Sequence, residues 1–179
     1  FNILLSKYSS QKDIAVGTVN ANRTRHEVQD LIGFFWNTIA IRSDLAKNPS
    51  IANMIKRVRD GVLAAFMNID IPFEKLLDEL DVERDLSRTP LFQVMLTLQS
   101  ANLNEFDIPG VKSTDIAIDN QTSNYELSLD IIEYRNRIRG VCTFDTSLFE
   151  KDSISRMVGH YINLLKQLDD LNSPIDCLW

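Results

Sequence analysis

The feature that most constrains the fold is a change of hydrophobic period along the chain. After residue 50 apolar side chains recur at helical spacing, on a stripe of Ile51, Met54, Ile55, Val58, Val62, Ala65 and Phe66. Between residues 125 and 145 apolar and polar residues alternate instead, which is typical of strands with one buried face. Because strands also interleave with helical segments, the sequence predicts an α/β fold, a mixed sheet with flanking helices.

Helical spacing marks further segments beside this stripe. It predicts helices over residues 1–8, 72–80 and 152–168, the last one amphipathic and about four turns long. Residues that can bond free backbone N–H groups precede two of the helices, which places N-caps at Ser50 and at Asp152 or Ser153. Pro72 suits the first turn of the helix that it opens.

Runs rich in β-branched and aromatic residues predict the strands. They lie at 13–19, 35–42 and 91–99, and a hairpin joins 125–133 to 138–145. Period-two alternation assigns the inner face of the hairpin to Leu127, Leu129, Ile131, Ile138 and Phe144. Trp36, and in part Phe34 and Phe35, are expected in the core.

Charge and cysteine usage argue against several classes of protein. The formal net charge is −6, and the basic residues are scattered among acidic ones, which argues against nucleic acid as a partner. The basic cluster of Arg135, Arg137 and Arg139 is expected at a solvated strand edge that discourages pairing. Cys142 and Cys177 are far apart and lack histidines at ligand spacing, so neither zinc nor a disulfide is expected.

The sequence also predicts the cellular location of the protein and its connections to neighbouring parts of a longer chain. No apolar run approaches the ~20 residues of a membrane span, so we expect a cytoplasmic protein with no membrane partner. Nothing before Phe1 could cap its helix, which suggests a fragment. The turn-rich stretch at 172–174 resembles a linker, and the loop 100–113 is expected to reach another part of the protein.

Five local strings, in this order, resemble the C-terminal half of nonribosomal peptide synthetase condensation domains. They are D-I-A-V-G-T at 13–18 with Asn22 and Arg23; I-G-F-F-W-N-T at 32–38, with Gly33 and Asn37, followed by Arg42; D-I-P-F-E at 70–74, with Asp70, Pro72 and Phe73; R-D-L-S-R-T-P-L-F at 84–92, with Arg84, Asp85, Ser87 and Arg88; and I-R-G at 138–140 with Phe144 and L-F at 148–149. The third block departs from the family pattern, because Asn68 and Ile69 stand where His-Gln is usual.

The resemblance implies a chloramphenicol-acetyltransferase-like half-domain. In this family two such halves enclose a tunnel, where a carrier-bound amine attacks a carrier-bound acyl or peptidyl thioester. Residues 1–170 would then be the C-terminal subdomain, and 171–179 the start of a linker. The implied partners are the N-terminal half, peptidyl or aminoacyl carrier proteins and an adjacent adenylation domain. No cofactor is expected to bind directly, since the phosphopantetheine arms of the carriers hold the substrates.

The family's catalytic motif H-H-x-x-x-D-G has no counterpart in this chain. Its two histidines, His26 and His160, are not followed by Asp-Gly at the required distance, and both are interpreted as structural. We therefore expect no catalytic residue here and no condensation activity from the chain alone, because a tunnel with one wall neither supplies the base nor holds two reactants together.

Ser123 and Asn124 are the candidates for contact with substrate. They precede a predicted strand, and by resemblance their segment borders the active site, where a hydroxyl and an amide could hydrogen-bond a tethered substrate. The other motif residues are interpreted as structural: Arg84, Asp85, Ser87 and Arg88 would tie a turn to its neighbours, and Asp70 with Pro72 would begin a helix.

Two alternatives remain beside the condensation reading. An epimerization or heterocyclization relative would share the fold, although P-L-F-Q-V at 90–94 fits condensation better. A module that docks a carrier protein without catalysis would belong to another functional class. Fusion to the N-terminal half separates this module from an enzyme, because a docking module would stay inactive.

Overall fold

The computed structural model describes residues 1–23, 25–81, 88–100, 110–111, 122–134 and 137–178. In chain order the elements are α1 (Asn2–Ser9), β1 (Asp13–Asn20), α2 (His26–Gln29), β2 (Asn37–Asp44), α3 (Ile51–Phe66), α4 (Phe73–Glu79), β3 (Val94–Ser100), β4 (Leu127–Tyr134), β5 (Arg137–Phe144), α5 (Lys151–Lys166) and the 3₁₀ turn η1 (Ile175–Cys177). Helices and strands therefore alternate as the hydrophobic periods predict.

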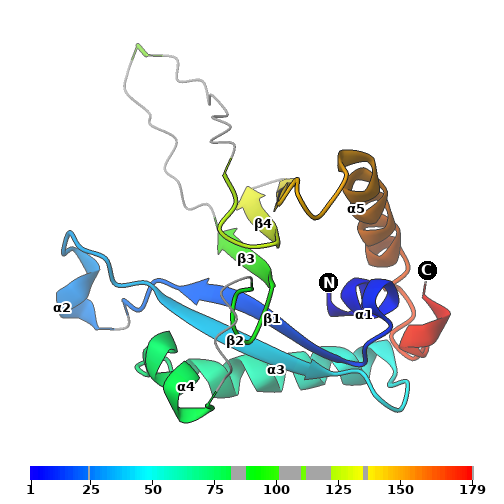
Figure 1. Cartoon of the computed structure of the whole chain (residues 1–179), viewed down its shortest axis with the longest axis horizontal. Coiled ribbons are helices and arrows are strands. Elements are labelled where there is room, and N and C mark those ends of the chain that lie inside the picture. The colour runs from blue at the N-terminus through cyan, green and yellow to red at the C-terminus, as the bar shows by residue number, and fades with distance from the viewer. Residues whose placement is uncertain (24, 82–87, 101–109, 112–121, 135–136, 179) are drawn as a thin grey trace.

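The strands form one mixed sheet in the order β2-β1-β3-β4-β5 (Figure 1). The two outer pairs, β1 with β2 and β4 with β5, are antiparallel, whereas β3 runs parallel to both of its neighbours. The connection from β3 to β4 is therefore long, because consecutive parallel neighbours cannot be joined by a tight hairpin. The predicted fold class, a mixed sheet with flanking helices, is confirmed.

One face of the sheet carries the hydrophobic core. This helix face consists of alternate strand residues: Ile14, Val16, Ile39, Ile41, Val94, Leu96, Leu127, Leu129, Cys142 and Phe144. Helices α1, α3 and α5 contribute Leu4, Ile51 and Ile154, each at most 4% exposed. Most of the stripe predicted on α3 meets the apolar face of the strands, and burial of both excludes water from this layer. Two members of the stripe, Ile55 and Phe66, are 53% and 40% exposed, so their predicted burial is wrong.

Helices α3 and α5 begin differently. Ser50 caps α3 as predicted, since its hydroxyl accepts a hydrogen bond from the backbone N–H of Asn53 at 3.3 Å. Helix α5 begins at Lys151, with Glu150 at the N-cap and no side-chain capping bond. The cap predicted at Asp152 or Ser153 is therefore wrong.

The predicted burial of Trp36 and Phe34 is also wrong. Strand β2 begins at Asn37, two residues later than expected, so both aromatic residues belong to the preceding loop and are 55% and 88% exposed. Phe35 is half-buried beneath the guanidinium of Arg23, whose Cζ lies 4.5 Å from the ring centre. The polar stretch expected to be irregular also contains the four-residue helix α2.

The hairpin of β4 and β5 forms, but its inner face is shorter than predicted. Leu127 and Leu129 are buried, whereas Ile138 is 74% exposed. Ile138 pairs with Glu133 near the far end of the hairpin, beyond the part of β5 that packs on the core through Cys142 and Phe144. The strand β5 is a sheet edge, and Arg137 and Arg139 on it are exposed; Arg135 lies outside the described residues.

The segment after residue 170 packs against the domain, and whether it leads into a linker remains a prediction. Ile175 and Leu178 are 1% and 4% exposed and belong to the main core. The backbone N–H groups of Ile51 and Ala52 donate to Ser173 and Leu171 at 3.0 and 2.8 Å. The packing could not be foreseen from the turn residues of this segment, because its partners at the start of α3 are distant in sequence.

Two sequence predictions fall largely outside the described residues. Of the loop 100–113, the structure describes only the backbone of residue 100 and residues 110–111, so its expected contact remains a prediction. Arg84, Asp85 and Ser87 also lie outside. Among the helices that the structure describes, none is long and apolar enough to cross a membrane.

Candidate functional site

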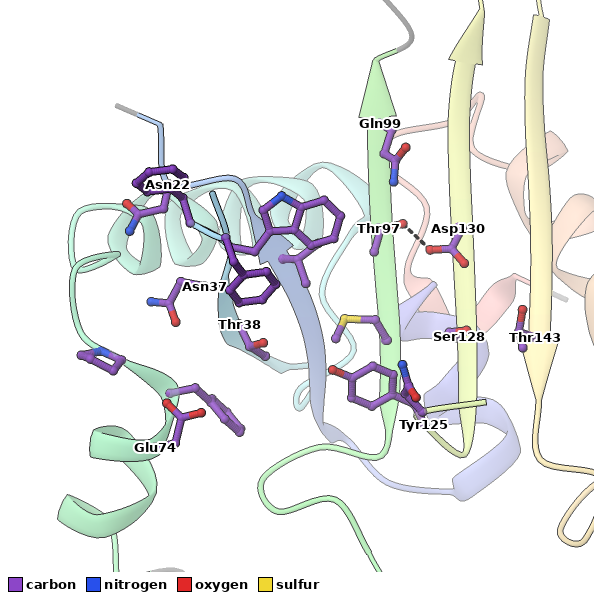
Figure 2. Close-up of a pocket in the computed structure, with 18 of the residues that line it drawn as sticks. Asn22, Asn37, Thr38, Glu74, Thr97, Gln99, Tyr125, Ser128, Asp130 and Thr143 are labelled. Carbon is purple, nitrogen blue, oxygen red and sulfur yellow. Dashed lines mark hydrogen bonds between the residues drawn. The ribbon is translucent and has the colours of Figure 1, made fainter. Parts of the chain in front are cut away.

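The sheet face opposite the helices carries a pocket of about 780 Å³ (Figure 2). Its floor is formed by strand residues that alternate with those of the helix face: Val19, Met95, Thr97, Gln99, Ser128, Asp130 and Thr143, called the pocket face below. Residues from the β1–β2 loop, from α4 and from the segment before β4 form its sides. Pockets of this volume suit small molecules or tethered groups.

Strand register brings the polar floor together. Met95 pairs with Ser128 and Thr97 with Asp130 across β3 and β4, and Ser128 pairs with Thr143 across β4 and β5. Paired residues point to the same side of a sheet, so three strands present hydroxyl and carboxylate groups side by side. These residues are far apart in sequence, and only the pairing makes them a site.

Asp130 holds the most specific polar contact of the floor. The Thr97 hydroxyl donates to Asp130 Oδ1 at 2.5 Å, a contact drawn in Figure 2. Thr97 is only 7% exposed and Asp130 is half-buried. A buried hydroxyl needs a hydrogen-bond partner, so the pair holds the carboxylate in one orientation at the pocket floor.

Three aromatic rings support one side of the pocket. Phe92, 1% exposed, lies between Phe73 of α4 and Tyr125, with ring centres 5.6 and 5.8 Å away. Its ring rests on Gly17 of β1, where a Cβ atom would come within 2.1 Å of Phe92 Cε2. The missing side chain at Gly17 therefore lets Phe92 lie against the sheet and position the two lining rings.

Asn37 joins the sheet to the turn between α3 and α4. Its side-chain Nδ2 donates to the carbonyls of Ile69 and Ile71 at 2.6 and 2.8 Å. Asp70 and Pro72 of the same turn line the pocket, and Pro72 is the N-cap of α4, one position before the first turn expected for it. Asn37 thus fixes the side of the pocket formed by this turn.

Arg23 organises the loop between β1 and β2. Its guanidinium donates to the carbonyl oxygens of Val28, Gln29, Leu31 and Gly33. Four carbonyls around one cation give the loop a defined shape, because a charged donor makes stronger hydrogen bonds than a neutral one. Phe34, Phe35 and Trp36, which follow in the same loop, line the pocket.

Both candidates for substrate contact, Ser123 and Asn124, line this pocket. The Ser123 hydroxyl donates to the carbonyl of Tyr125 at 2.5 Å, so its proton is used locally and its oxygen remains as an acceptor. Asn124 is exposed beside it. Their proposed contact with substrate remains a prediction, but the structure places both on the side of the pocket.

The motif residues interpreted as structural lie in several places. Asp70, Pro72, Phe73 and Asn37 line the pocket, whereas Gly33 lies outside its lining, close to the ring of Phe35. Arg42 and Arg88 also lie outside the lining and are exposed. Arg42 makes a bidentate ion pair with Asp13, 2.7 Å at its shortest, which joins β2 to β1 and lowers the pKa of the Asp13 carboxyl through the hydrogen bonds it donates.

Neither histidine lines the pocket. His26 begins α2 and is exposed, and His160 of α5 lies within 2.9 Å of the Tyr8 hydroxyl through Nδ1. That contact joins α5 to α1 on the helix side of the sheet. The structural interpretation of both residues remains a prediction.

The pocket is acidic. Asp70, Glu74 and Asp130 line it, and its described lining contains no lysine or arginine. Burial, and secondly the charge of Asp130, raises the pKa of the nearby Cys142 thiol. No three His, Cys, Asp or Glu side chains come together as a possible metal site in the part of the chain that is described.

Sequence reasoning missed the floor residues Thr97, Gln99 and Asp130. A signal was present, because Thr97 and Gln99 alternate with Leu96 and Leu98, so one face of this half of β3 is polar. The run was interpreted only as rich in strand-forming residues. The parallel pairing that gives this face its neighbours has no local signature.

Known proteins of similar sequence are peptide synthetases. Subunits D and B of linear gramicidin synthase from Brevibacillus parabrevis are 42% and 41% identical over 168 and 170 residues. The matches cover 93% and 94% of this chain but only 3% of each relative. The chain therefore spans a small part of the synthetases that it resembles.

Solved structures share the fold. A four-domain nonribosomal peptide synthetase, holo-AB3403 bound to AMP and glycine, matches with a TM-score of 0.88 at 22% identity, over 97% of this chain and 14% of that one. The condensation domain of the monacolin K polyketide synthase MokA matches with a TM-score of 0.80 at 18% identity, over 97% of this chain and 40% of that one. The condensation-domain family profile matches residues 1–178, so this chain belongs to the condensation domain family of nonribosomal peptide synthetases.

Proposed function

We propose that this chain is the C-terminal half of a condensation domain and forms one wall of the tunnel in which the amide bond is made. The observation that best supports this proposal is the pocket on the sheet face opposite the helices, which is lined by Ser123 and Asn124. The polar residues on this sheet face are suited to line a tunnel, which the N-terminal half of the domain would close. The match to about two fifths of the MokA condensation domain supports the same division.

In the proposed reaction the amine of one carrier-bound substrate attacks the thioester of another. The nitrogen forms a bond to the carbonyl carbon, the carbon–sulfur bond breaks, and the amine proton ends on the released thiol of the phosphopantetheine arm. This wall binds and orients the tethered groups, while the family's histidine motif belongs to the other half. Holding two reactants in attack geometry can contribute ~7–11 kcal/mol to the barrier reduction.

The role of this half is positioning, because its two histidines lie outside the pocket. We expect Asn124→Ala in a complete domain to lower the condensation rate, with the uptake of both loaded carriers as a separate measurement. Asn163→Ala, on an exposed surface of α5, is the matched control. An unchanged rate in Asn124→Ala would count against this contact.

The experiment that tests the function compares three proteins: this chain alone, its N-terminal half alone, and the two fused in their natural order. Each is mixed with one aminoacyl-loaded acceptor carrier and one acyl-loaded donor carrier, and amide formation is measured. We expect product only from the fusion. Turnover by this chain alone would contradict the proposal, and a folded fusion that binds carriers without turnover would favour the docking module.

A further inference from the structure

The pocket floor contains a carboxylate, that of Asp130, whose orientation is held and which makes no ion pair with any described residue. Arg139 of β5 lies on the same sheet face, diagonal to Asp130, but it is exposed and does not line the pocket. Asp130 Oδ1 accepts the Thr97 hydroxyl, and no other described residue donates a hydrogen bond to the carboxylate. The described pocket lining has no lysine or arginine, while Asp70 and Glu74 add negative charge at its side. A half-buried carboxylate loses part of its hydration, so a cation from outside the chain would be bound favourably there.

The size and chemistry of the pocket favour an organic cation. About 780 Å³ leaves room for an amino-acid side chain together with part of a tethering arm. Among the described residues, no three potential ligands come together to hold a metal ion. An ammonium or guanidinium group at the end of a side chain could reach Asp130 at the floor while its backbone stays at the pocket mouth.

The attacking amine is a poor occupant for this position. It must lose its proton before it attacks the thioester, and a carboxylate in contact would stabilise the charged ammonium form instead. A side-chain cation stays charged throughout the reaction and is under no such constraint. The negative floor would at the same time disfavour a substrate with an acidic side chain.

We infer that Asp130 is a specificity-determining residue, which selects a carrier-bound substrate whose side chain carries an ammonium or guanidinium group. This inference rests on the proposed function and deepens it. The hydrogen bond from Thr97 presets the carboxylate, so the pocket binds the cation without reorganising. The same chemistry could come from the donor or from the acceptor, and the experiment separates the two.

The test uses the complete condensation domain with loaded carrier proteins. Lysyl and ornithyl groups are compared with leucyl groups, first on the acceptor carrier and then on the donor carrier, and kcat/KM is measured for each pair. Asp130→Asn keeps the side-chain size and an oxygen that accepts from Thr97 but removes the charge. Asp169→Asn, an exposed acid outside the pocket, controls for net charge.

We expect Asp130→Asn to lower kcat/KM about ten- to hundredfold for cationic substrates on one of the two carriers, and to change it little for leucyl substrates. Asp130→Glu should recover part of the preference. Equal losses for leucyl and lysyl substrates, or no loss for either, would overturn the inference. Absence of amide formation by the unsubstituted domain with every pair would instead contradict the proposed function.

Discussion

The two faces of the sheet differ in polarity and in burial. On the helix face, Ile14, Val16 and Leu127 belong to one core cluster with residues of α1 and α5 and are nearly inaccessible. On the pocket face, Ser128 and Asp130 alternate along β4 with the buried leucines, and they line the pocket together with other polar residues. Adjacent residues of one strand therefore belong separately to the core and to the pocket, because successive side chains of a strand point to opposite sides.

This division shows how a domain of this fold can hold a polar pocket on a stable scaffold. Burial of apolar area by the helices supplies most of the stabilisation, and it is confined to one side. The other side is free to carry hydroxyl, amide and carboxylate groups. The apolar members of the pocket face are Val19 and Met95. Phe92, which lies outside the pocket lining, is buried between Gly17 of β1 and Phe73 of α4.

The sharpest test of this comparison uses two neighbours in β4. Leu127→Ala removes a side chain that is 2% exposed on the helix face and should lower the free energy of unfolding by about 2–5 kcal/mol. Ser128→Ala on the pocket face should change it by less than about 0.5 kcal/mol. Urea unfolding of the complete condensation domain measures both. Similar changes at the two positions would contradict the division of the faces.

Gly17→Ala tests the packing of Phe92 against the sheet beside the pocket. The new methyl group would meet the ring of Phe92, which cannot swing away because Phe73 and Tyr125 hold it, so we expect a loss of about 1–3 kcal/mol. Gly159→Ala in α5 is the control, since its Cβ meets nothing within 4 Å and alanine should stabilise the helix by roughly 0.5–1 kcal/mol. A neutral Gly17→Ala would show that Phe92 relaxes freely.

Asn37→Ala tests the tie between the sheet and the side of the pocket. It removes two hydrogen bonds to the carbonyls of Ile69 and Ile71 and should cost about 1–2 kcal/mol. Asn163→Ala, on exposed α5, should cost less than about 0.5 kcal/mol. Thermal unfolding of the two variants compares them. A difference near zero would mean that the turn before α4 holds its position without Asn37.

Thiol reactivity gives the smallest effect and reports on Asp130. The raised pKa of Cys142 reduces its thiolate fraction at pH 8, so iodoacetamide should modify the exposed Cys177 first. Asp130→Asn removes a negative charge that opposes ionisation, which lowers the pKa of Cys142 and should speed its modification by a factor of about two to five. Mass spectrometry of the two cysteine peptides measures both rates. An unchanged rate at Cys142 would show that burial alone controls this thiol.

Local periodicity predicted much of the helix face and little of the pocket face. The stripe of α3 and the alternation of β4 placed Ile51, Leu127 and Leu129 in the core. The same reasoning failed for Ile138 and Trp36, which have the pattern of buried residues but lie beyond the helices or before the strand begins. Of the pocket, resemblance to the family identified Ser123 and Asn124, while Thr97 and Asp130 had no local mark of a shared site.

Hydrophobic spacing by itself determined most of the helices and strands of this protein, their order and the buried side of the hairpin near the core, because burial depends on side chains three, four or two positions apart. The tertiary structure alone decided which elements became neighbours. Thr97 and Asp130 are 33 residues apart and meet only because β3 and β4 pair in parallel, and Gly17 meets Phe92 only through the fold of β1 beside β3. Contacts between distant residues depend on the packing of the whole domain, which short-range patterns do not specify.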